Sequence, residues 1–286
     1  MAAHRLPPPE PLFLDAPGGA RFCLYHATPE APRAALVYLH PFAEELNKSR
    51  RAVACTARAL AANGVAVLQI DVGGCGDSGG EFVDASWDGW LDDTAVACAW
   101  LADKSGLPVG LWGLRLGATL ALDYAASRAP VARLLLWQPV ASGATFLTQF
   151  LRLRLANAIL QEGASTRGGT EALREDLRAG QTLDIAGYEL APKLALALDG
   201  LDVSRMAVTG CKVDWFEVVA SSERPLAPAT ARTAWHLRAL GVDLHTQTVA
   251  APQFWNTQEI EEAPGLLAAT LAVFAPAQGE AQGETQ

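Results

Sequence analysis

The sequence predicts an α/β protein with a mostly parallel sheet flanked by helices. Between residues 34 and 137, short apolar runs alternate with segments of helical periodicity, which is typical of parallel strands joined by crossover helices. A Gly-Leu-Arg-Leu-Gly turn at residues 113–117 stands between an apolar run and a helix-like run. Half of the 286 residues are hydrophobic, so the chain can bury a large core.

The first elements predict an antiparallel hairpin. Strand-like residues 12–16 and 21–26 are separated by Pro-Gly-Gly, a strong turn signal. The alternation that follows predicts strands at 34–39, 65–70, 109–112 and 133–137, and helices at 50–62, 87–102 and 116–127.

A helical insertion is expected in the middle of the chain. Residues 140–200 give no strand signal and contain helix-like runs broken by glycines, among them Gly163. The sheet then resumes with a strand at 203–209, a helix at 227–240, a strand at 242–249 and a helix at 264–274. We therefore expect a core of residues 1–139 and 201–275, a cap of residues 140–200, and a disordered tail of residues 276–286 that repeats Ala-Gln-Gly-Glu.

Composition narrows the possible partners. Thirty-one acidic and 22 basic residues give a net charge of -9, which disfavours nucleic acid. The five cysteines are widely spaced without a C-x-x-C pair, so no disulfide framework, metal site or cofactor is expected. The start of the chain has no apolar core of a signal peptide, and charges interrupt the apolar stretches. We expect a cytoplasmic protein with no stable membrane insertion.

The turn at residues 113–117 has the frame of a nucleophile elbow, G-x-S-x-G, with Arg115 at the serine position. The two glycines leave room for a strained central residue whose side chain projects above the end of the sheet. A guanidinium stays protonated and cannot attack a carbonyl, so acyl-enzyme chemistry at this position is excluded.

Several segments together resemble the α/β-hydrolase superfamily and, within it, the group called exosortase A system-associated hydrolase 2. They are His-Pro-Phe-Ala-Glu-Glu-Leu-Asn-Lys-Ser-Arg-Arg at 40–51, Ile70-Asp71 with residues 74–79, and residues 112–117, 136–139, 147–154 and 254–255. The resemblance implies an α/β-hydrolase fold. It also implies a link to the bacterial system that sorts proteins with a C-terminal Pro-Glu-Pro anchor and to exopolysaccharide production.

The superfamily's functional positions map onto this chain one at a time. The turn His40-Pro41-Phe42 matches the oxyanion turn, so the backbone N–H groups of Phe42 and Leu116 would form the anion-binding pair. Arg115 takes the nucleophile position. Asp214 matches the acid, taken to follow the penultimate strand, and Gln253 is the nearest equivalent of the histidine. The resemblance thus implies a triad that lacks two of its three members.

Two interpretations of Arg115 remain open. It is an anion receptor at a helix N-terminus, oriented by Asp214 and Gln253, or it forms an internal ion pair with Asp214 or Glu44. His40 is a general base or, more commonly, a residue that shapes the strand end. Glu44 and its neighbour Glu45 position water or a cationic group, or favour the positive end of a helix dipole.

Ser78 is expected to serve turn geometry, and Cys75 and Cys211 to be small buried hydrophobes. The apolar helix at residues 146–160 is expected to close over the site, although a membrane surface or a partner is the alternative.

Three functions follow from the sequence. The first is a protein that binds an anionic small molecule under the cap. The second is a hydrolase of esters or thioesters in which Glu44, His40 or Asp214 activates water and Arg115 stabilises the oxyanion. The third is a non-catalytic scaffold in the exosortase or exopolysaccharide machinery.

Overall fold

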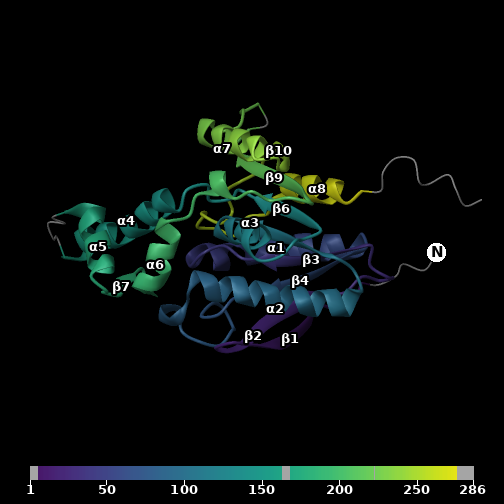
Figure 1. Ribbon diagram of the computed structural model, residues 1–286, viewed down its shortest axis with the longest axis horizontal. Coiled ribbons are helices and arrows are strands. Elements are labelled where there is room, and N and C mark those ends of the chain that lie inside the picture. Colours follow the sequence, from purple (N-terminus) through teal and green to yellow (C-terminus); the bar gives the residue numbers. More distant parts are fainter. Residues whose placement is uncertain (1–5, 163–167, 222, 276–286) are drawn as a thin grey trace, which may run out of the picture.

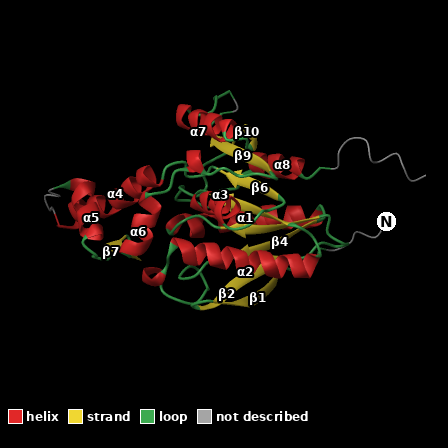
Figure 2. Ribbon diagram, in the orientation of Figure 1, coloured by secondary structure: helices red, strands yellow, loops and turns green. Residues whose placement is uncertain are grey.

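The computed structural model describes residues 6–162, 168–221 and 223–275 around an eight-stranded sheet (Figures 1 and 2). Its strand order is β1-β2-β4-β3-β5-β6-β9-β10. The strands are β1 (Glu10–Ala16), β2 (Gly19–His26), β3 (Ala34–Leu39), β4 (Val65–Ile70), β5 (Val109–Leu114), β6 (Arg133–Trp137), β9 (Lys212–Val219) and β10 (Asp243–Ala250). Strands β1 and β2 form the predicted antiparallel hairpin, and the strands from β4 to β10 run parallel.

Helices cover both faces of the sheet and divide the core in two. Along β3, Val37 and Leu39 face one cluster of buried residues, whereas Leu36 and Tyr38 face the other. The first cluster includes residues of α2, α3 and α7, and the second includes residues of α1 and α8. The bounds of these helices are α1 (Glu44–Ala62), α2 (Trp87–Ser105), α3 (Leu116–Ser127), α7 (Pro228–Ala239) and α8 (Pro264–Val273). Because both faces are covered, the central parallel strands β3, β4, β5 and β6 are nearly continuous apolar runs.

The segment between β6 and β9 projects beyond the sheet, at the left of Figure 1. It contains α4 (Gly143–Glu162), α5 (Gly169–Arg178), a hairpin of β7 (Leu183–Ile185) and β8 (Tyr188–Leu190), and α6 (Pro192–Asp199). The hairpin corrects the expectation of a purely helical segment. Its strands are too short to show a period in the sequence, and Ala186 and Gly187 join them with φ values of 54° and 85°. Gly163 and the tail from residue 276 lie outside the described residues.

The strand predicted at residues 203–209 is wrong. Val203–Arg205 form a short 3-10 helix, η2, and the strand β9 begins only at Lys212. Val203 and Val208 are buried in the core from this turn, so their apolar character does not reflect a strand. Asp214 and Glu217 interrupt the apolar pattern of β9 and hide it from a search for apolar runs.

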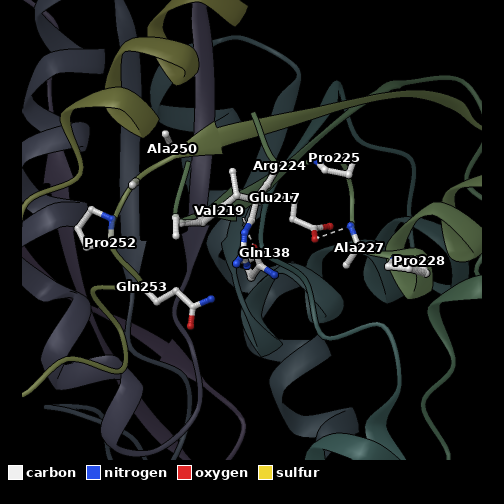
Figure 3. A pocket seen from close by; sticks show the side chains of 13 residues that line it. Gln138, Glu217, Val219, Arg224, Pro225, Ala227, Pro228, Ala250, Pro252 and Gln253 are labelled. Carbon is white, nitrogen blue, oxygen red and sulfur yellow. Dashed lines mark hydrogen bonds between the residues drawn. The ribbon is translucent and has the colours of Figure 1, made fainter. Parts of the chain in front are cut away.

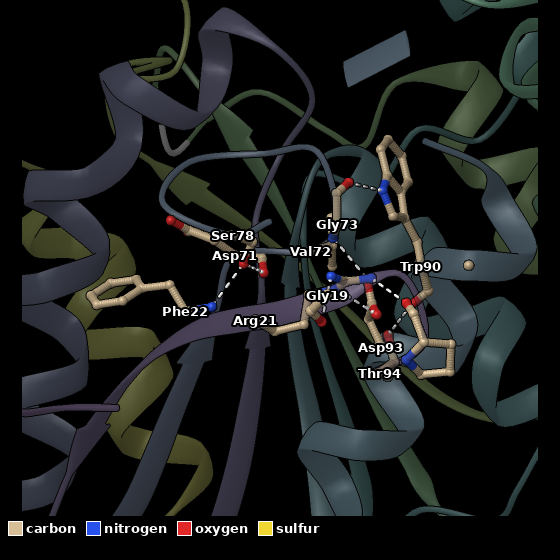
Figure 4. A network of polar contacts seen from close by, with 12 residues as sticks. Gly19, Arg21, Phe22, Asp71, Val72, Gly73, Ser78, Trp90, Asp93 and Thr94 are labelled. Carbon is tan, nitrogen blue, oxygen red and sulfur yellow. Dashed lines mark hydrogen bonds and ion pairs between the residues drawn. The ribbon is translucent and has the colours of Figure 1, made fainter. Parts of the chain in front are cut away.

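A buried ion pair ties β2 to α2 (Figure 4). The Arg21 Nε lies 2.7 Å from the Asp93 Oδ1, and the other Asp93 oxygen accepts the backbone N–H of Gly73 at 2.7 Å. The remaining Arg21 nitrogens donate to the carbonyls of Pro17 and Gly19. This network joins the turn of the edge hairpin to the loop that follows β4. Within the described ranges, no helix has the length and apolar character needed to cross a membrane.

Candidate functional site

The turn from β5 to α3 has the geometry of a nucleophile elbow. Arg115 stands between the two elements with φ of 55°, and its N–H donates to the carbonyl of Trp137 at 2.9 Å. A Cβ on Gly113 would overlap Ala118, and a Cβ on Gly117 would overlap the carbonyls of β3 and its following residue. The two glycines are therefore required for this turn to pack.

Glu45 and the ring of Trp255 hold the guanidinium of Arg115 in place. Its Nε donates to Glu45 Oε1 at 3.2 Å, and its guanidinium carbon lies 5.6 Å from the centre of the Trp255 ring. The side chains of Arg115 and Glu45 are each 19% exposed. Among the described residues, the hydrogen bond and the ion pair of the Arg115 side chain both involve Nε, so the N–H groups of its two terminal nitrogens are available to a ligand.

A cavity of about 730 Å³ opens in front of this guanidinium. The start of α1, helix α4 and the loop after β10 form its walls together with the elbow. Aromatic side chains supply much of the lining, namely Phe42, Phe146, Phe150 and Trp255. Lys48, Gln138, Gln149 and Gln253 add polar groups. The cavity therefore combines an apolar wall with two cations, Lys48 and Arg115, and two carboxylates, Glu44 and Glu45.

Backbone strain gathers at this cavity. Four non-glycine residues in the described part of the chain have positive φ: Ala43, Arg115, Gln138 and Ala186. All four line the cavity. Such conformations cost of order 1–3 kcal/mol each and are concentrated at functional sites. Gln138 and Ala186 carry no signal of this strain in the sequence, because neither belongs to the residue types that favour positive φ.

Glu45, and not Glu44 or Asp214, is the ion-pair partner of Arg115. Its Oε2 is buried and has no hydrogen-bond partner among the described residues. Burial raises the pKa of the Glu45 carboxyl, while Arg115 and Lys48 oppose that rise. The partner of Arg115 is thus a carboxylate that takes up a proton more readily than usual.

Asp214 does not lie in the site, which corrects its assignment as the acid. It is the third residue of β9, in register with Leu135 of β6, and so lies toward the amino ends of the strands. Its carboxylate lies 3.5 Å from both Arg133 Nε and His245 Nδ1. Arg115 follows the carboxyl end of β5, so Asp214 cannot orient it.

His40 has a structural role in the turn after β3. Its Nδ1 lies 2.7 Å from the Pro41 carbonyl, and its Nε2 accepts the N–H of Val72 at 3.3 Å, which assigns the proton to Nδ1. Burial lowers the pKa of the ring, so it is neutral. His40 lines a small pocket behind the turn and does not line the Arg115 cavity.

The resemblance assigns the anion-binding pair to Phe42, which lines the Arg115 cavity, and to Leu116, which lines the small pocket that His40 also lines. Neither backbone N–H donates to an acceptor within the described ranges, and Leu116 is the first residue of α3. The Phe42 ring packs against Phe146 and Phe150 of α4, with centroids 5.5 and 5.0 Å apart. Glu44, the first residue of α1, accepts a hydrogen bond from the Tyr188 hydroxyl at 3.3 Å. This bond joins the start of α1 to the segment between β6 and β9.

A second cavity, of about 900 Å³, adjoins the first (Figure 3). It lies between the loops that follow β9 and β10, and Gln138 and Gln253 line both cavities. Gln253 lies in the loop after β10 and lines the same cavity as Arg115. Glu217 and Gln138 were not selected from the sequence. Glu217 gave no signal, and Gln138 belonged only to a segment of the family resemblance.

Three other residues with reactive groups are structural. Ser78 donates to the carbonyl of Asp71 and accepts the N–H of Phe22 at 2.8 Å, so it fixes the turn after β4. Burial raises the pKa of Cys75 to about 12 and also raises that of Cys211. Both thiols therefore stay protonated at neutral pH.

Comparisons with known proteins agree with this geometry. The model of the family described as serine aminopeptidase, S33, matches residues 30–173, half of the chain. Est1E from Butyrivibrio proteoclasticus with ferulic acid bound is similar in structure, with a TM-score of 0.59, 16% identity, and coverage of 92% of this chain and 96% of that one. A putative hydrolase from Agrobacterium vitis S4 has a TM-score of 0.58, 17% identity, and coverage of 95% and 100%. The mouse alpha/beta hydrolase domain-containing protein 10 has a TM-score of 0.55 and 16% identity, with coverage of 93% of this chain and 96% of that one. No curated protein sequence matches the chain.

Proposed function

Since this chain belongs to the serine aminopeptidase S33 family of α/β hydrolases, we propose that it uses the hydrolase elbow to bind an anionic small molecule. One observation carries the proposal. Arg115 occupies the nucleophile position with its Nε held by Glu45 and its terminal N–H groups free at a cavity of about 730 Å³. A guanidinium edge with two parallel N–H donors is suited to a carboxylate or a phosphate.

The surroundings of Arg115 support an anion. The N–H groups of Phe42 and Leu116 are free, and Leu116 begins a helix whose positive dipole end favours negative charge. The Trp255 ring faces the guanidinium and restricts its motion. Glu45 competes for the same cation, but burial raises the pKa of its carboxyl and weakens that competition.

The lining indicates the rest of the ligand. Phe42, Phe146, Phe150 and Trp255 provide aromatic surface beside the cation. A carboxylate with an apolar or aromatic tail would bury its tail against these rings and pair its head with Arg115. Ferulic acid, which is bound in the similar Est1E structure, belongs to this chemical class and is a reasonable first probe.

Calorimetric titration with ferulate and with 3-phenylpropionate tests the proposal. Arg115→Gln should weaken binding by about tenfold or more, because it removes the charge-assisted hydrogen bonds. Arg205→Gln is the control, since Arg205 is 86% exposed on η2 and outside the cavity. Equal affinities of the wild type and Arg115→Gln, or no binding by either, would contradict the proposal.

A hydrolase with a non-serine mechanism is the second candidate. Of the three bases considered for it, only Glu44 lines the cavity, because His40 is engaged in its turn and Asp214 lies toward the other end of the sheet. The free N–H groups of Phe42 and Leu116 would then serve the oxyanion. Turnover of p-nitrophenyl esters or of acyl thioesters that Glu44→Gln abolishes would favour this candidate.

Association with the exosortase and exopolysaccharide machinery is also part of the proposal. It rests on the resemblance of residues 40–51, 147–154 and the other segments. A cytoplasmic protein would act there as a ligand carrier or as a scaffold. Deletion in the host, followed by measurement of Pro-Glu-Pro protein sorting and of secreted polysaccharide, tests the association. Complementation by Arg115→Gln would show that the protein acts as a scaffold without an anion.

A further inference from the structure

The second cavity has a volume of about 900 Å³ and lies between the loops that follow β9 and β10 (Figure 3). Its walls are mostly alanine and proline, namely Ala220, Ala227, Ala250, Ala251, Pro225, Pro228 and Pro252. Four polar side chains interrupt this lining: Gln138, Glu217, Arg224 and Gln253. The combination of a roomy apolar wall and a few convergent polar groups is typical of a small-molecule site.

Glu217 is the buried charge of this cavity. The residue is 4% exposed, and its Oε1 accepts the N–H of Ala227 at 3.0 Å (Figure 3). Its Oε2 has no hydrogen-bond partner among the described residues. A buried carboxylate oxygen without a donor is unfavourable, so this oxygen has the capacity to accept a hydrogen bond from a ligand.

Of the polar side chains that line this cavity, Glu217 is the one best placed to bind a charged ligand. Gln138 Oε1 accepts the N–H of Val218 at 2.6 Å, so its amide nitrogen is the group left for a ligand. Arg224 is exposed to solvent, where water screens its charge. Glu217 is therefore the charged group of this cavity that lies in a low-dielectric setting, where a pair with a cation is strongest.

We infer that the second cavity binds a protonated amine with Glu217 as its counter-ion. Gln138 and Gln253 line both cavities, so the two cavities adjoin, and we extend the inference to one molecule that occupies both. This extension rests on the proposed function. The ligand is then a zwitterion with an ammonium group at Glu217 and an anionic group at Arg115. The class includes ω-amino carboxylates and amines that carry a phosphate.

The first experiment tests the amine site alone. The wild-type protein is titrated with n-butylammonium at neutral pH, with n-butanol as the uncharged probe of similar length. The charged probe should bind about tenfold or more tightly than n-butanol, because it forms a charge-assisted hydrogen bond with Glu217. Glu217→Gln should remove that difference. Glu223→Gln, an exposed residue outside the cavity, should not change it.

Equal binding of the two probes to the wild type, or no binding of either, overturns the inference even where Glu217→Gln does not fold. Retention of n-butylammonium affinity in a folded Glu217→Gln variant also overturns it. The circular dichroism spectrum of each variant establishes that it is folded.

The second experiment uses ω-amino carboxylates of increasing chain length on the full chain. An ω-amino carboxylate whose chain length lets it reach both charges should bind more tightly than n-butylammonium or a simple carboxylate. Arg115→Gln and Glu217→Gln should each reduce this gain in affinity. If simple carboxylates fail to bind and n-butylammonium still depends on Glu217, the proposed function fails and the amine site stands. If only the Arg115-dependent carboxylate binds, the amine site is wrong and the proposed function stands.

Discussion

At the scale of the residue, the elbow directs the side chain at position 115 whatever its chemistry. Arg115 has φ of 55° although arginine does not favour this region, and a Cβ at Gly113 or Gly117 would overlap the neighbouring backbone. The strain of a nucleophile elbow is therefore present without a nucleophile. In the proposed function, the Arg115 guanidinium and the free N–H groups of Phe42 and Leu116 would together serve an anion at the position where a serine hydrolase stabilises its oxyanion.

The proposal that the elbow lacks both a nucleophile and a base gives the first prediction. Fluorophosphonate probes should not label the protein, and Arg115→Ser should hydrolyse p-nitrophenyl butyrate at least about 10⁴-fold more slowly than an intact triad enzyme. Serine at this position would have no imidazole, since Gln253 cannot accept a proton and His40 is engaged in its turn. Intact-mass spectrometry and a spectrophotometric assay are the measurements, with an intact serine esterase as the positive control. A phosphonylated serine in either protein would show that a base exists.

Glu45 gives a prediction about pH. Because burial raises the pKa of Glu45 above its usual value, the carboxylate takes up its proton at a higher pH than in the unfolded chain. Protonation frees Arg115, so an anion should bind more tightly as pH falls through the raised pKa of Glu45, and binding should take up a proton. Benzenesulfonate is a suitable probe because it stays ionised throughout this range.

The matched variant for this test is Glu45→Gln, which keeps an acceptor for the Arg115 Nε. It should bind benzenesulfonate up to about tenfold more tightly at neutral pH, or about 1.4 kcal/mol, with no dependence on pH in this range. Calorimetry in two buffers of different ionisation enthalpy measures the proton uptake. A pH dependence that survives in Glu45→Gln would assign the effect to another group.

At the scale of the element, the central strands could be predicted from the sequence because they are buried on both faces. The predicted bounds of β3, β4 and β6 and of helix α3 are confirmed, since apolar runs of strand length are distinctive in a parallel sheet. The fold class and the elbow followed from these elements. The structural neighbours confirm the α/β-hydrolase fold.

The failures occur where tertiary contacts override the local pattern. Asp214 and Glu217 make β9 look unlike a buried strand. Arg133 and His245 lie near the Asp214 carboxylate, and Glu217 accepts the N–H of Ala227. The error in β9 led directly to the misplacement of Asp214. The sequence names Asp214 or Glu44 as the ion-pair partner of Arg115 and not Glu45, because it does not show which carboxylate of α1 faces the elbow.

The glycines of the elbow give a prediction about an element. In Gly117→Ala the new Cβ would overlap the carbonyls of Leu39 and His40, so α3 would have to move away from β3. We expect a loss of about 1–3 kcal/mol in the free energy of unfolding, together with weaker binding at Arg115. Gly200→Ala is the control, because its Cβ would lie 3.5 Å from the nearest atom, the carbonyl oxygen of Ala197. Urea titration of both variants is the measurement. Equal stabilities would show that the elbow can relax.

At the scale of the whole molecule, the site depends on segments far apart in the chain. Glu45 comes from α1, Arg115 from the elbow and Trp255 from the loop after β10, while α4 supplies Phe146 and Phe150. The sheet places the first three at one edge, and the segment between β6 and β9 covers them. The site therefore forms only when α1, the β5–α3 turn, α4 and the loop after β10 are brought together by the fold.

The pair of Arg21 and Asp93 tests how the edge hairpin contributes to the stability of the molecule (Figure 4). Both side chains are almost fully buried, with 6% and 2% exposed. Arg21→Met would leave Asp93 without its cation, and breaking a buried pair from one side costs about 3–5 kcal/mol. The double variant Arg21→Met with Asp93→Asn should recover part of this loss, because no charge then stays buried. Arg128→Met is the control, since its pairs with Asp88 and Asp92 are exposed and such pairs contribute about 0–1 kcal/mol.

Chemical denaturation gives the size of the loss, and amide hydrogen exchange gives its location. Relative to the wild type, Arg21→Met should accelerate amide exchange more in β1 and β2 than in β5 and β6. The reason is that the lost contacts join the hairpin to α2 and to the loop after β4. Uniformly faster exchange would mean that the hairpin unfolds only with the whole sheet. A loss of less than about 1 kcal/mol would mean that Asp93 is already neutral in the folded protein, since burial raises the pKa of its carboxyl against the opposing effects of Gly73 and Arg21.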